Sequence, residues 1–289
     1  MLKYIYLHID VNEDYIKEFA TAMIDDGIVV IDVRKKCKAD GQENDNGIDE
    51  NILEKLKLFF EGEQNDYLLI TDNEAAAQAA GEFVVGYGLD YKGKTSYIIE
   101  SLLDTSAKYF RMIYAHIKGE TFEILRTDRL IIREIALDDL SELYEVYETL
   151  ADCKYIEPLY DWESEKEFTV SYIKNMYQFF NYGLWLVFEK ETGRLVGRVG
   201  IENREIDGEL RQELGYLIRK DCQRKGYAYE ACSAIMEYAK EEIGIERLFL
   251  CSEKENKPSV SLAQKLGFKL YASLPDGMNI YNKLLVSDF

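Results

Sequence analysis

The sequence predicts two consecutive domains of different fold class. We expect a doubly wound α/β domain over residues 1–120, followed over residues 121–289 by an α+β domain whose mixed, mostly antiparallel sheet is covered by helices. A length of 289 residues suits about two domains. In the first half, apolar strand-like runs alternate with helical runs, a pattern typical of a mostly parallel sheet. In the second half, strands joined by short turns follow two helical runs, a pattern that favours antiparallel pairing.

The first domain is expected to open with a strand, a helix and a second strand. Asn12 precedes an amphipathic run and so stands where an N-cap is expected. β-branched and apolar runs predict strands, and an Ala-rich run predicts a helix. The expected elements are strands Tyr4–Ile9, Ile28–Val33, Tyr67–Thr71, Phe83–Tyr87 and Tyr97–Ile99, helices Glu13–Asp26, Asn51–Phe60, Asn73–Ala80 and Thr105–Lys118, and a polar loop Lys35–Asp49.

The second domain shows hairpin and helix signals in alternation. The acidic pair Asp138-Asp139 favours a helix start, because carboxylates interact well with a helix N-terminus. Glu191-Thr192-Gly193 separates two apolar runs and predicts a hairpin. The expected elements are strand Leu130–Arg133, helices Leu137–Thr149 and Glu165–Phe180, hairpin strands Leu184–Glu189 and Leu195–Ile201, strand Gln212–Arg219, helix Tyr227–Glu242, strand Arg247–Ser252, helix Ser259–Leu266, and strands Phe268–Ser273 and Asn279–Leu285.

The composition narrows the classes of function. A chain with 47% hydrophobic and 13% aromatic residues can fill folded cores, unlike a disordered chain. Its net charge of −19 argues against nucleic acid and anionic membranes as partners. We see no signal peptide or membrane-spanning run, and the 5 cysteines contain no C-x-x-C pair, so we expect a cytoplasmic location. With 2 histidines in the chain, His8 and His116, we expect no metal site.

One segment points to chemistry: the passage from strand Gln212–Arg219 through a short loop into helix Tyr227–Glu242. The first amides of a helix lack intrahelical acceptors, and the helix dipole favours an anion beside them. Gly226 allows close approach of a ligand to the backbone, while Arg224 and Lys225 add positive charge. The junction is therefore a candidate diphosphate cradle, although it matches neither G-x-G-x-x-G nor the GK[ST] loop.

Several motifs around this junction resemble those of one enzyme family. Gln223-x-x-Gly226-x-Ala228 resembles the Q/R-x-x-G-x-G/A signature of the GCN5-related N-acetyltransferase (GNAT) superfamily. The stretch from Asn256 to Phe268 is similar to its N-x-x-S-x-x-L-x-x-K-L-G-F helix, and Thr127–Arg133 is similar to the T-x-R-L-x-L-R opening of enzymes that acetylate ribosomal-protein N-termini. The resemblance spans residues 123–289 and implies an acetyltransferase that takes acetyl-CoA, or a related acyl-CoA, as donor.

The resemblance also implies where the donor binds. The diphosphate would lie on the amides of Arg224–Ala228, and the pantetheine arm would pair like an added strand with the backbone near Leu217–Arg219. That strand would have to splay from strand Arg247–Ser252. Asn256 resembles a residue that contacts the pantetheine side, with a helix cap or turn as its alternative role. The expected cofactor-binding residues are Leu217, Ile218, Arg219, Gln223, Arg224, Lys225, Gly226, Tyr227, Ala228 and Asn256.

Two side chains are candidates for acid–base catalysis. Glu213, in a Glu-x-Gly-Tyr stretch like that of the subfamily, could accept the amine proton, or could orient the amine or pair with Arg219 or Arg211. Many GNAT enzymes have a Tyr four residues before the Gly of L-G-F, where this chain has Ala263. Ser259 could instead protonate the leaving thiolate, with a helix N-cap as its alternative role. Other hydroxyl groups nearby are those of Ser261 and Tyr271.

The first domain has a resemblance of its own. Leu69–Tyr87 resembles the last motif region of haloacid-dehalogenase (HAD)-like phosphatases, a strand that ends in acids, an Ala-rich helix and V-V-G. In that family a D-x-D pair and Mg²⁺ carry the reaction. Here the first strand ends in Asp10-Val11-Asn12, and Asn73 follows Asp72, so an acid is missing at both places. We expect a HAD-like, non-catalytic domain that shapes the acceptor site, binds a ligand or mediates a homodimer.

Together these features predict transfer of acetyl from acetyl-CoA to a primary amine by direct attack in a ternary complex. The acidic chain favours a cationic acceptor, either a small molecule such as a polyamine or aminoglycoside, or an amine of a basic peptide or protein. Two alternatives remain open. One is a regulatory CoA-binding module without acceptor chemistry, and the other is a bifunctional protein with an N-terminal phosphatase.

Overall fold

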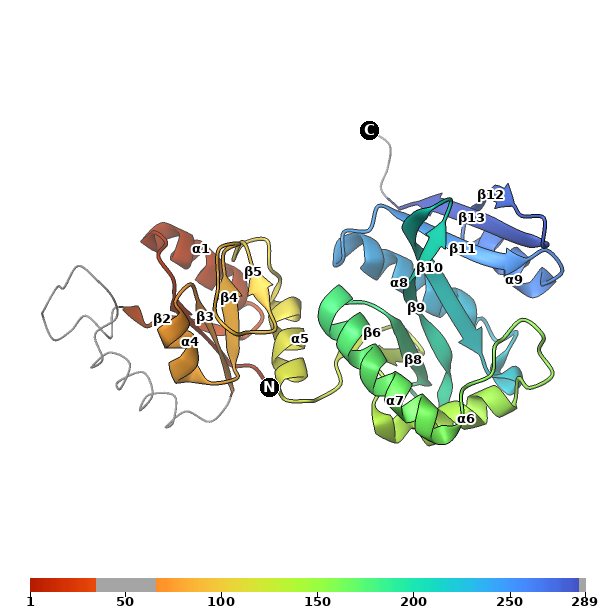
Figure 1. The fold of residues 1–289 in the computed structure, drawn as a ribbon, viewed down its shortest axis with the longest axis horizontal. Helices are drawn as coiled ribbons and strands as arrows, with labels where there is room; N and C mark the ends of the chain where they lie inside the picture. The colour runs from red at the N-terminus through yellow and green to blue at the C-terminus, as the bar shows by residue number, and fades with distance from the viewer. Residues whose placement is uncertain (35–65, 286–289) are drawn as a thin grey trace, which may run out of the picture. The chain divides into compact units, whose positions relative to one another are not determined.

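The computed structural model describes residues 1–34 and 66–285. The chain divides into two compact units, Met1–Glu120 and Thr121–Phe289, which are described separately here (Figure 1). The predicted loop Lys35–Asp49 and the predicted helix Asn51–Phe60 lie outside the described residues. None of the helices in the described ranges has the length and apolar character needed to cross a bilayer.

Within residues 1–34 and 66–120, the first unit has a parallel sheet of five strands in the order β2-β1-β3-β4-β5. Leu68 and Ile70 of the central strand pack with helices α1 and α5, whereas Leu69 packs with α4. Successive strand residues point to opposite faces, so helices cover both faces of this sheet. The likeness to HAD proteins stays a prediction. The elements are β1 Tyr4–His8, α1 Glu13–Ile24, β2 Val29–Asp32, β3 Tyr67–Thr71, α4 Glu74–Ala80, β4 Val84–Tyr87, β5 Ile98–Ile99 and α5 Ala107–Ile117.

Asparagine side chains cap two helices of this unit. The predicted cap Asn12 accepts a hydrogen bond from the backbone N of Tyr15 at 2.8 Å. Asn73 accepts from the backbone N of Ala75 at 2.9 Å and of Ala76 at 3.0 Å. Each cap satisfies amides that the first turn leaves without a partner. The Asn that stands beside Asp72 thus has a structural role as a helix cap.

The second unit contains a mixed sheet of eight strands in the order β12-β13-β11-β10-β9-β8-β7-β6. Strands β10 and β11 run parallel, and the other neighbouring pairs are antiparallel. This confirms the predicted mixed, mostly antiparallel sheet. The strands are β6 Glu123–Arg126, β7 Leu130–Arg133, β8 Leu184–Glu189, β9 Leu195–Ile206, β10 Glu209–Ile218, β11 Arg247–Glu253, β12 Lys269–Ser273 and β13 Met278–Leu284.

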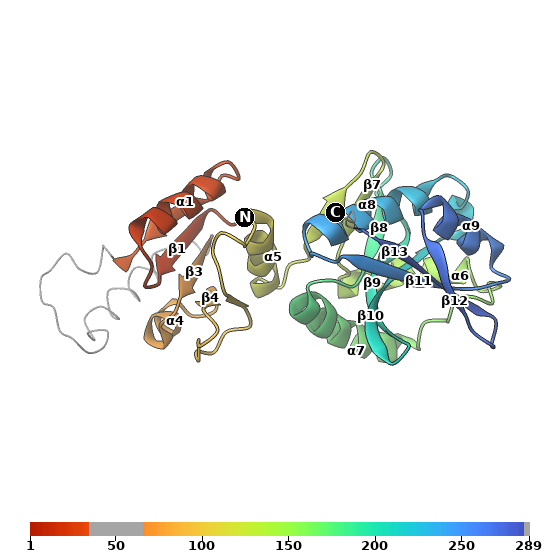
Figure 2. The ribbon, with the colours of Figure 1, turned by 90° about the horizontal axis from the view of Figure 1, so that it is seen from above.

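Helices cover both faces of this second sheet, with α7 and α8 on opposite sides of its strands (Figure 2). Trp185 of β8 is fully buried and meets Tyr238 of α8 edge to face, with ring centroids 5.7 Å apart. Trp185 is thus a core residue. The helical elements are η1 Leu137–Asp139, α6 Leu140–Glu148, α7 Trp162–Tyr172, η2 Ile173–Phe180, η3 Lys220–Cys222, α8 Tyr227–Glu241 and α9 Lys257–Lys265.

The helix predicted over Glu165–Phe180 is confirmed, since α7 and η2 together cover this range, but its second half departs from α-helical geometry. There the chain forms the π-helix η2, whose wider turn has hydrogen bonds from residue i to i+5. This turn brings Tyr172 and Tyr177 onto one side, where their rings meet edge to face at 5.5 Å. Both phenols bond to the backbone of Leu184, one at its N–H and the other at its carbonyl. Strand β6, which the sequence analysis missed, pairs with β7 at the edge of the sheet.

Gly200 of β9 allows the backbone of a neighbouring segment to approach closely. A Cβ added to Gly200 would lie 1.9 Å from the carbonyl oxygen of Gly183. We expect Gly200→Ala to destabilise the second unit by about 1–3 kcal/mol, because the clash is with backbone that cannot rotate away. Urea unfolding followed by tryptophan fluorescence measures this, since both tryptophans, Trp162 and Trp185, lie in this unit. The exposed Glu205→Ala on the same strand is the control, and an equal midpoint for the two variants would contradict the prediction.

Candidate active site

The site begins where β10 and β11 part. They share one register pair, Glu213 with Phe249, while β10 stays paired with β9 as far as Ile218. Arg219 N donates to Val196 O at 3.0 Å. Backbone groups alternate in direction along an antiparallel strand, so Leu217 and Arg219 bond toward β9. Residues 216 and 218 therefore present their backbone N–H and C=O groups to the opening between β10 and β11.

The backbone of the three predicted strand residues, Leu217, Ile218 and Arg219, faces in different directions. A Cβ on Gly197 of β9 would lie 2.1 Å from the carbonyl oxygen of Leu217, which shows how closely Leu217 faces that strand. Leu217 and Arg219 are thus committed to the sheet. Of the three predicted strand residues, Ile218 alone faces the opening, and its carbonyl accepts a hydrogen bond from Gln223 Nε2 at 3.0 Å. Gln223 thereby ties the loop to the end of the strand.

The predicted cradle is an open helix start. Gly226 has φ +88° and Arg224 has φ +60°, and α8 begins directly afterwards. Glycine suits the first of these angles because it has no Cβ. Within the described part of the chain, the amides of Arg224–Ala228 donate to no protein acceptor. A row of free amides at the positive end of a 15-residue helix fits an anionic group such as a diphosphate.

Thr127 and Arg129, from the T-x-R motif before β7, hold the start of α8 in place. Glu230, in the first turn of α8, accepts hydrogen bonds from Thr127 Oγ1 at 2.5 Å and from Arg129 Nε at 2.7 Å. Arg129 Nη1 also donates to the carbonyl of Lys225 at 3.0 Å, and its guanidinium lies 4.6 Å from the ring centroid of Tyr227. Burial opposes ionisation of Glu230, but the bonds from Thr127 and Arg129 outweigh it and lower the pKa of Glu230.

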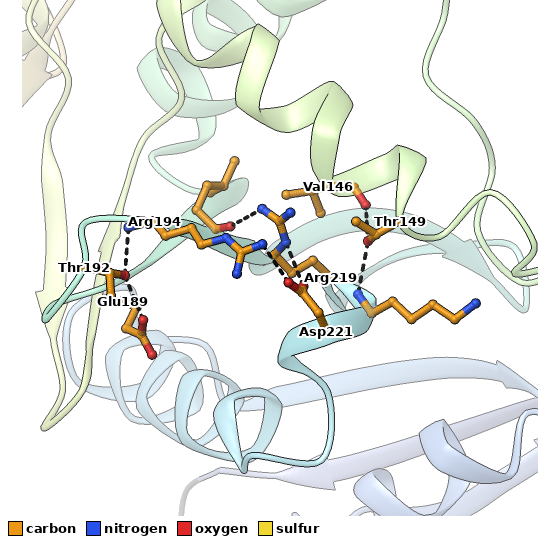
Figure 3. A network of polar contacts seen from close by, with 9 residues as sticks. Val146, Thr149, Glu189, Thr192, Arg194, Arg219 and Asp221 are labelled. Atoms are coloured by element: carbon orange, nitrogen blue, oxygen red, sulfur yellow. Dashed lines mark hydrogen bonds and ion pairs between the residues drawn. The ribbon is translucent and has the colours of Figure 1, made fainter.

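A second polar network holds the other side of the loop (Figure 3). Asp221 accepts from Arg194 Nη2 at 2.6 Å and from Arg219 Nε at 2.9 Å. Lys220 N donates to Thr149 Oγ1 at 3.1 Å, which joins the loop to the end of α6. The Arg219 residue is only 8% exposed, so its guanidinium is a structural cation. The guanidinium and the backbone N–H of Arg219 are therefore both engaged within the protein, with Asp221 and with Val196.

The hairpin of β8 and β9 also contacts the helix start. Glu189 accepts hydrogen bonds from Tyr227 Oη and from Thr192 Oγ1, the second at 2.7 Å (Figure 3 labels Glu189 and Thr192). The Tyr227 side chain is therefore buried against the hairpin, and its amide is the part that faces the cradle.

Glu213 bridges three strands at the point where the sheet opens. Its Oε2 lies 3.1 Å from Arg204 Nη1, and its Oε1 accepts from the backbone N of Cys251 at 3.0 Å. The alternative partners Arg219 and Arg211 are wrong, because Arg204 of β9 takes that place. Both carboxylate oxygens of Glu213 are engaged, so this side chain links β9, β10 and β11.

Two hydroxyl groups face each other across the opening. Ser259 Oγ lies 3.0 Å from Tyr216 Oη, which joins α9 to β10. Burial raises the pKa of Tyr216 to about 12, so its phenol is protonated at neutral pH. The cap alternative for Ser259 is wrong: Asn256 caps α9, and its Oδ1 accepts from Ser259 N at 3.3 Å. The cap alternative for Asn256 is confirmed.

One acidic residue near Glu213 was missed by the sequence analysis. Glu202 of β9 stands directly opposite Glu213 in the ladder, and its Oε1 accepts from Tyr172 Oη at 3.2 Å. Burial raises its pKa and the charge of Glu213 adds to this rise, while Arg198 opposes it. An acid at the end of the apolar run Leu195–Ile201 was the signal that could have pointed to it.

In the first unit, two acids lie at the carboxyl ends of neighbouring strands. Asp72 Oδ2 accepts from the backbone N of Asp10 at 2.9 Å. Arg34 pairs with Asp32 at 2.9 Å and lies 3.9 Å from Asp10. Across residues 1–34 and 66–285, no group of three His, Cys, Asp or Glu side chains is placed to hold a metal ion.

The Glu230 brace gives a pH-dependent contribution to stability. A lowered pKa in the fold means stability that is present above the ordinary pKa of 4.5 and is lost as pH falls through the folded value. We expect Glu230→Gln to cost about 1–3 kcal/mol at pH 7 and less at pH 3.5, because the stability that the charge contributes decreases as pH falls below the ordinary pKa of 4.5. Urea unfolding at both pH values measures this, with the exposed Glu237→Gln of α8 as control. A cost that is equal at both pH values would contradict it.

Comparison with known proteins matches the second unit. Residues 129–269 match the family model described as an acetyltransferase (GNAT) domain. The uncharacterized N-acetyltransferase YnaD of Bacillus subtilis is 30% identical over 146 residues, which cover 50% of this chain and 82% of that protein. The uncharacterized N-acetyltransferase p20 of Bacillus licheniformis is 29% identical over 164 residues, 53% of this chain and 86% of that protein.

A solved structure shares the fold of this unit. The apo form of RimL, a ribosomal L7/L12 alpha-N-protein acetyltransferase, aligns with a TM-score of 0.51 at 15% identity and covers 57% of this chain and 95% of its own. The opened sheet, the free helix start and these sequence matches agree. The chain belongs to the GNAT family of acyl-CoA-dependent N-acetyltransferases.

Proposed function

We propose that the protein transfers acetyl from acetyl-CoA to a primary amine by direct attack within a ternary complex. The parting of β10 and β11 after one register pair, beside the free amides that start α8, is the observation that supports this most. The gap offers backbone groups at residues 216 and 218 to the amide-containing pantetheine arm. The amides of Arg224–Ala228 suit the diphosphate of CoA.

In this proposal each remaining donor residue has a defined part. Arg224 and Lys225 add positive charge beside the diphosphate, and Gly226 and Ala228 leave room for it. Ile218 receives the pantetheine arm. Ser259, supported by the protonated phenol of Tyr216 at 3.0 Å, supplies a proton to the leaving sulfur. Glu213 holds the three strands in the geometry that places the amine beside the thioester.

The acceptor we propose is a cationic primary amine. The chain carries a net charge of −19, which attracts cations over long range. RimL, whose structure has the same fold, is a ribosomal L7/L12 alpha-N-protein acetyltransferase. An amine of a basic peptide or protein is therefore one acceptor class, and a small polyamine or aminoglycoside is the other.

We propose that the first unit makes no chemical contribution to this transfer. Asn12 and Asn73 occupy the positions where a phosphatase of the resembled family would need acids, and both asparagines cap helices. A role in binding a ligand or in forming a homodimer is compatible with a parallel sheet covered on both faces.

Gly226 provides the test of the donor site. Any side chain at φ +88° is strained by about 1–2 kcal/mol, and a Cβ there would lie 3.3 Å from Arg129 Nη2. We expect Gly226→Ala to weaken CoA binding about tenfold, and Gly226→Asp to weaken it further because a carboxylate would face the diphosphate. Isothermal titration calorimetry with CoA measures this.

The matched control is Gly208→Asp, which has φ +75° in the turn between β9 and β10 with nothing within 4 Å of its Cβ. We expect this variant to bind CoA as wild type does. Equal binding by Gly226→Asp and wild type would contradict the proposed donor site. Thiol release from acetyl-CoA with a panel of amines then separates the enzyme from a regulatory module, which would bind CoA tightly and release no thiol with any amine.

A further inference from the structure

Two carboxylates stand side by side at the opening of the sheet, and their surroundings differ. Glu213 of β10 uses both oxygens, one with Arg204 and the other with the backbone N of Cys251. Glu202 of β9 uses Oε1 alone, to accept from Tyr172 Oη. In the part of the chain that the structure describes, Oε2 of Glu202 accepts no hydrogen bond.

The free oxygen of Glu202 points over a residue without a side chain. A Cβ added to Gly215 would lie 3.9 Å from Glu202 Oε2. Gly215 is the residue of β10 just before Tyr216, whose hydroxyl spans the opening to Ser259. The unengaged oxygen of Glu202 thus lies near the backbone of β10, the strand that borders the opening, where Leu184 Cδ2 also lies 3.0 Å from the added Cβ.

The titratable and charged groups that face Glu202 come from three elements. Tyr172 approaches from α7, Arg198 and Arg204 lie along β9, and Glu213 lies across the ladder on β10. Arg204 is paired with Glu213 at 3.1 Å. Burial, with the neighbouring charge of Glu213, raises the pKa of Glu202 despite the two arginines. A proton acceptor works best when its pKa lies near the working pH, so this shift favours a base.

We propose that Glu202, rather than Glu213, is the general base that takes the proton from the acceptor amine. The inference rests on the proposed acetyl transfer. Oε2 of Glu202 removes one proton from the ammonium group, and the freed nitrogen attacks the thioester carbonyl carbon. The C–N bond forms and the C–S bond breaks. The second proton lost by nitrogen reaches the leaving sulfur through the hydroxyl of Ser259, and Glu202 returns its proton to water.

Glu202→Gln is the direct test. Glutamine has the same shape and still accepts from Tyr172, but it does not take up a proton. We expect kcat/KM for the amine to fall at least about 100-fold, and its rise on the acid side of the pH profile to disappear. The Kd for CoA, measured by calorimetry, stays unchanged. Glu205→Gln, an exposed carboxylate on the same strand, is the matched control and keeps the activity and the pH profile of wild type.

Glu202→Asp is a second variant, which distinguishes loss of the carboxylate from loss of the fold. Thermal unfolding of each variant checks that it is folded. Aspartate keeps a carboxylate one methylene shorter, so we expect partial activity together with a retained acid-side rise. If wild type transfers acetyl and Glu202→Gln keeps both its kcat/KM and its acid-side rise, the inference is overturned while the proposed function stands. If wild type releases thiol with no amine in the panel, the proposed function fails and the inference fails with it.

Discussion

The parting of β10 from β11 is the constraint on which the rest of the second unit depends. A sheet gains its stability from continuous ladders, and here a parallel pair stops after one register pair, Glu213 with Phe249. The structure compensates with side chains. Glu213 takes the backbone N–H of Cys251 that a longer ladder would have used, and Tyr216 and Ser259 join the two sides through their hydroxyls. Side-chain hydrogen bonds therefore stabilise the gap between β10 and β11, through Glu213 on one side and through Tyr216 and Ser259 on the other.

The loop between β10 and α8 is also fixed by side-chain contacts, although the amides of Arg224–Ala228 have no protein acceptor in the described part of the chain. Glu230, Arg129 and Thr127 fix it from the side of β7, and Asp221 fixes it to the hairpin and to Arg219. A site that binds an anion through backbone amides needs those amides fixed in advance, since each rotation frozen on binding would cost affinity. The ion pairs around this loop provide that order, which explains why several charged side chains beside it pair with other protein groups.

Local pattern was enough to predict much of the fold and the helix start of the site. Tyr67–Thr71 and Leu184–Glu189 were predicted with the bounds that the structure shows, because their apolar character reflects burial in a sheet. The side-chain partners across neighbouring strands could not be predicted in this way. Glu213 pairs with Arg204 and stands opposite Glu202, and such neighbours depend on the register between strands, which the sequence of one strand does not specify. The π-helical turns of η2 likewise have no signal in the period of the sequence.

Strand β6 has a consequence for where the catalytic fragment starts. The similarity to the GNAT family begins at residue 129, yet the backbone N of Phe122 donates to Glu134 Oε2 at 2.9 Å, and Glu134 is only 3% exposed. A chain shortened to the matched range would lose that donor and the edge strand that shields β7. The folded acetyltransferase domain thus begins before residue 129, where the family match starts. A fragment expressed alone has to include Phe122 and strand β6.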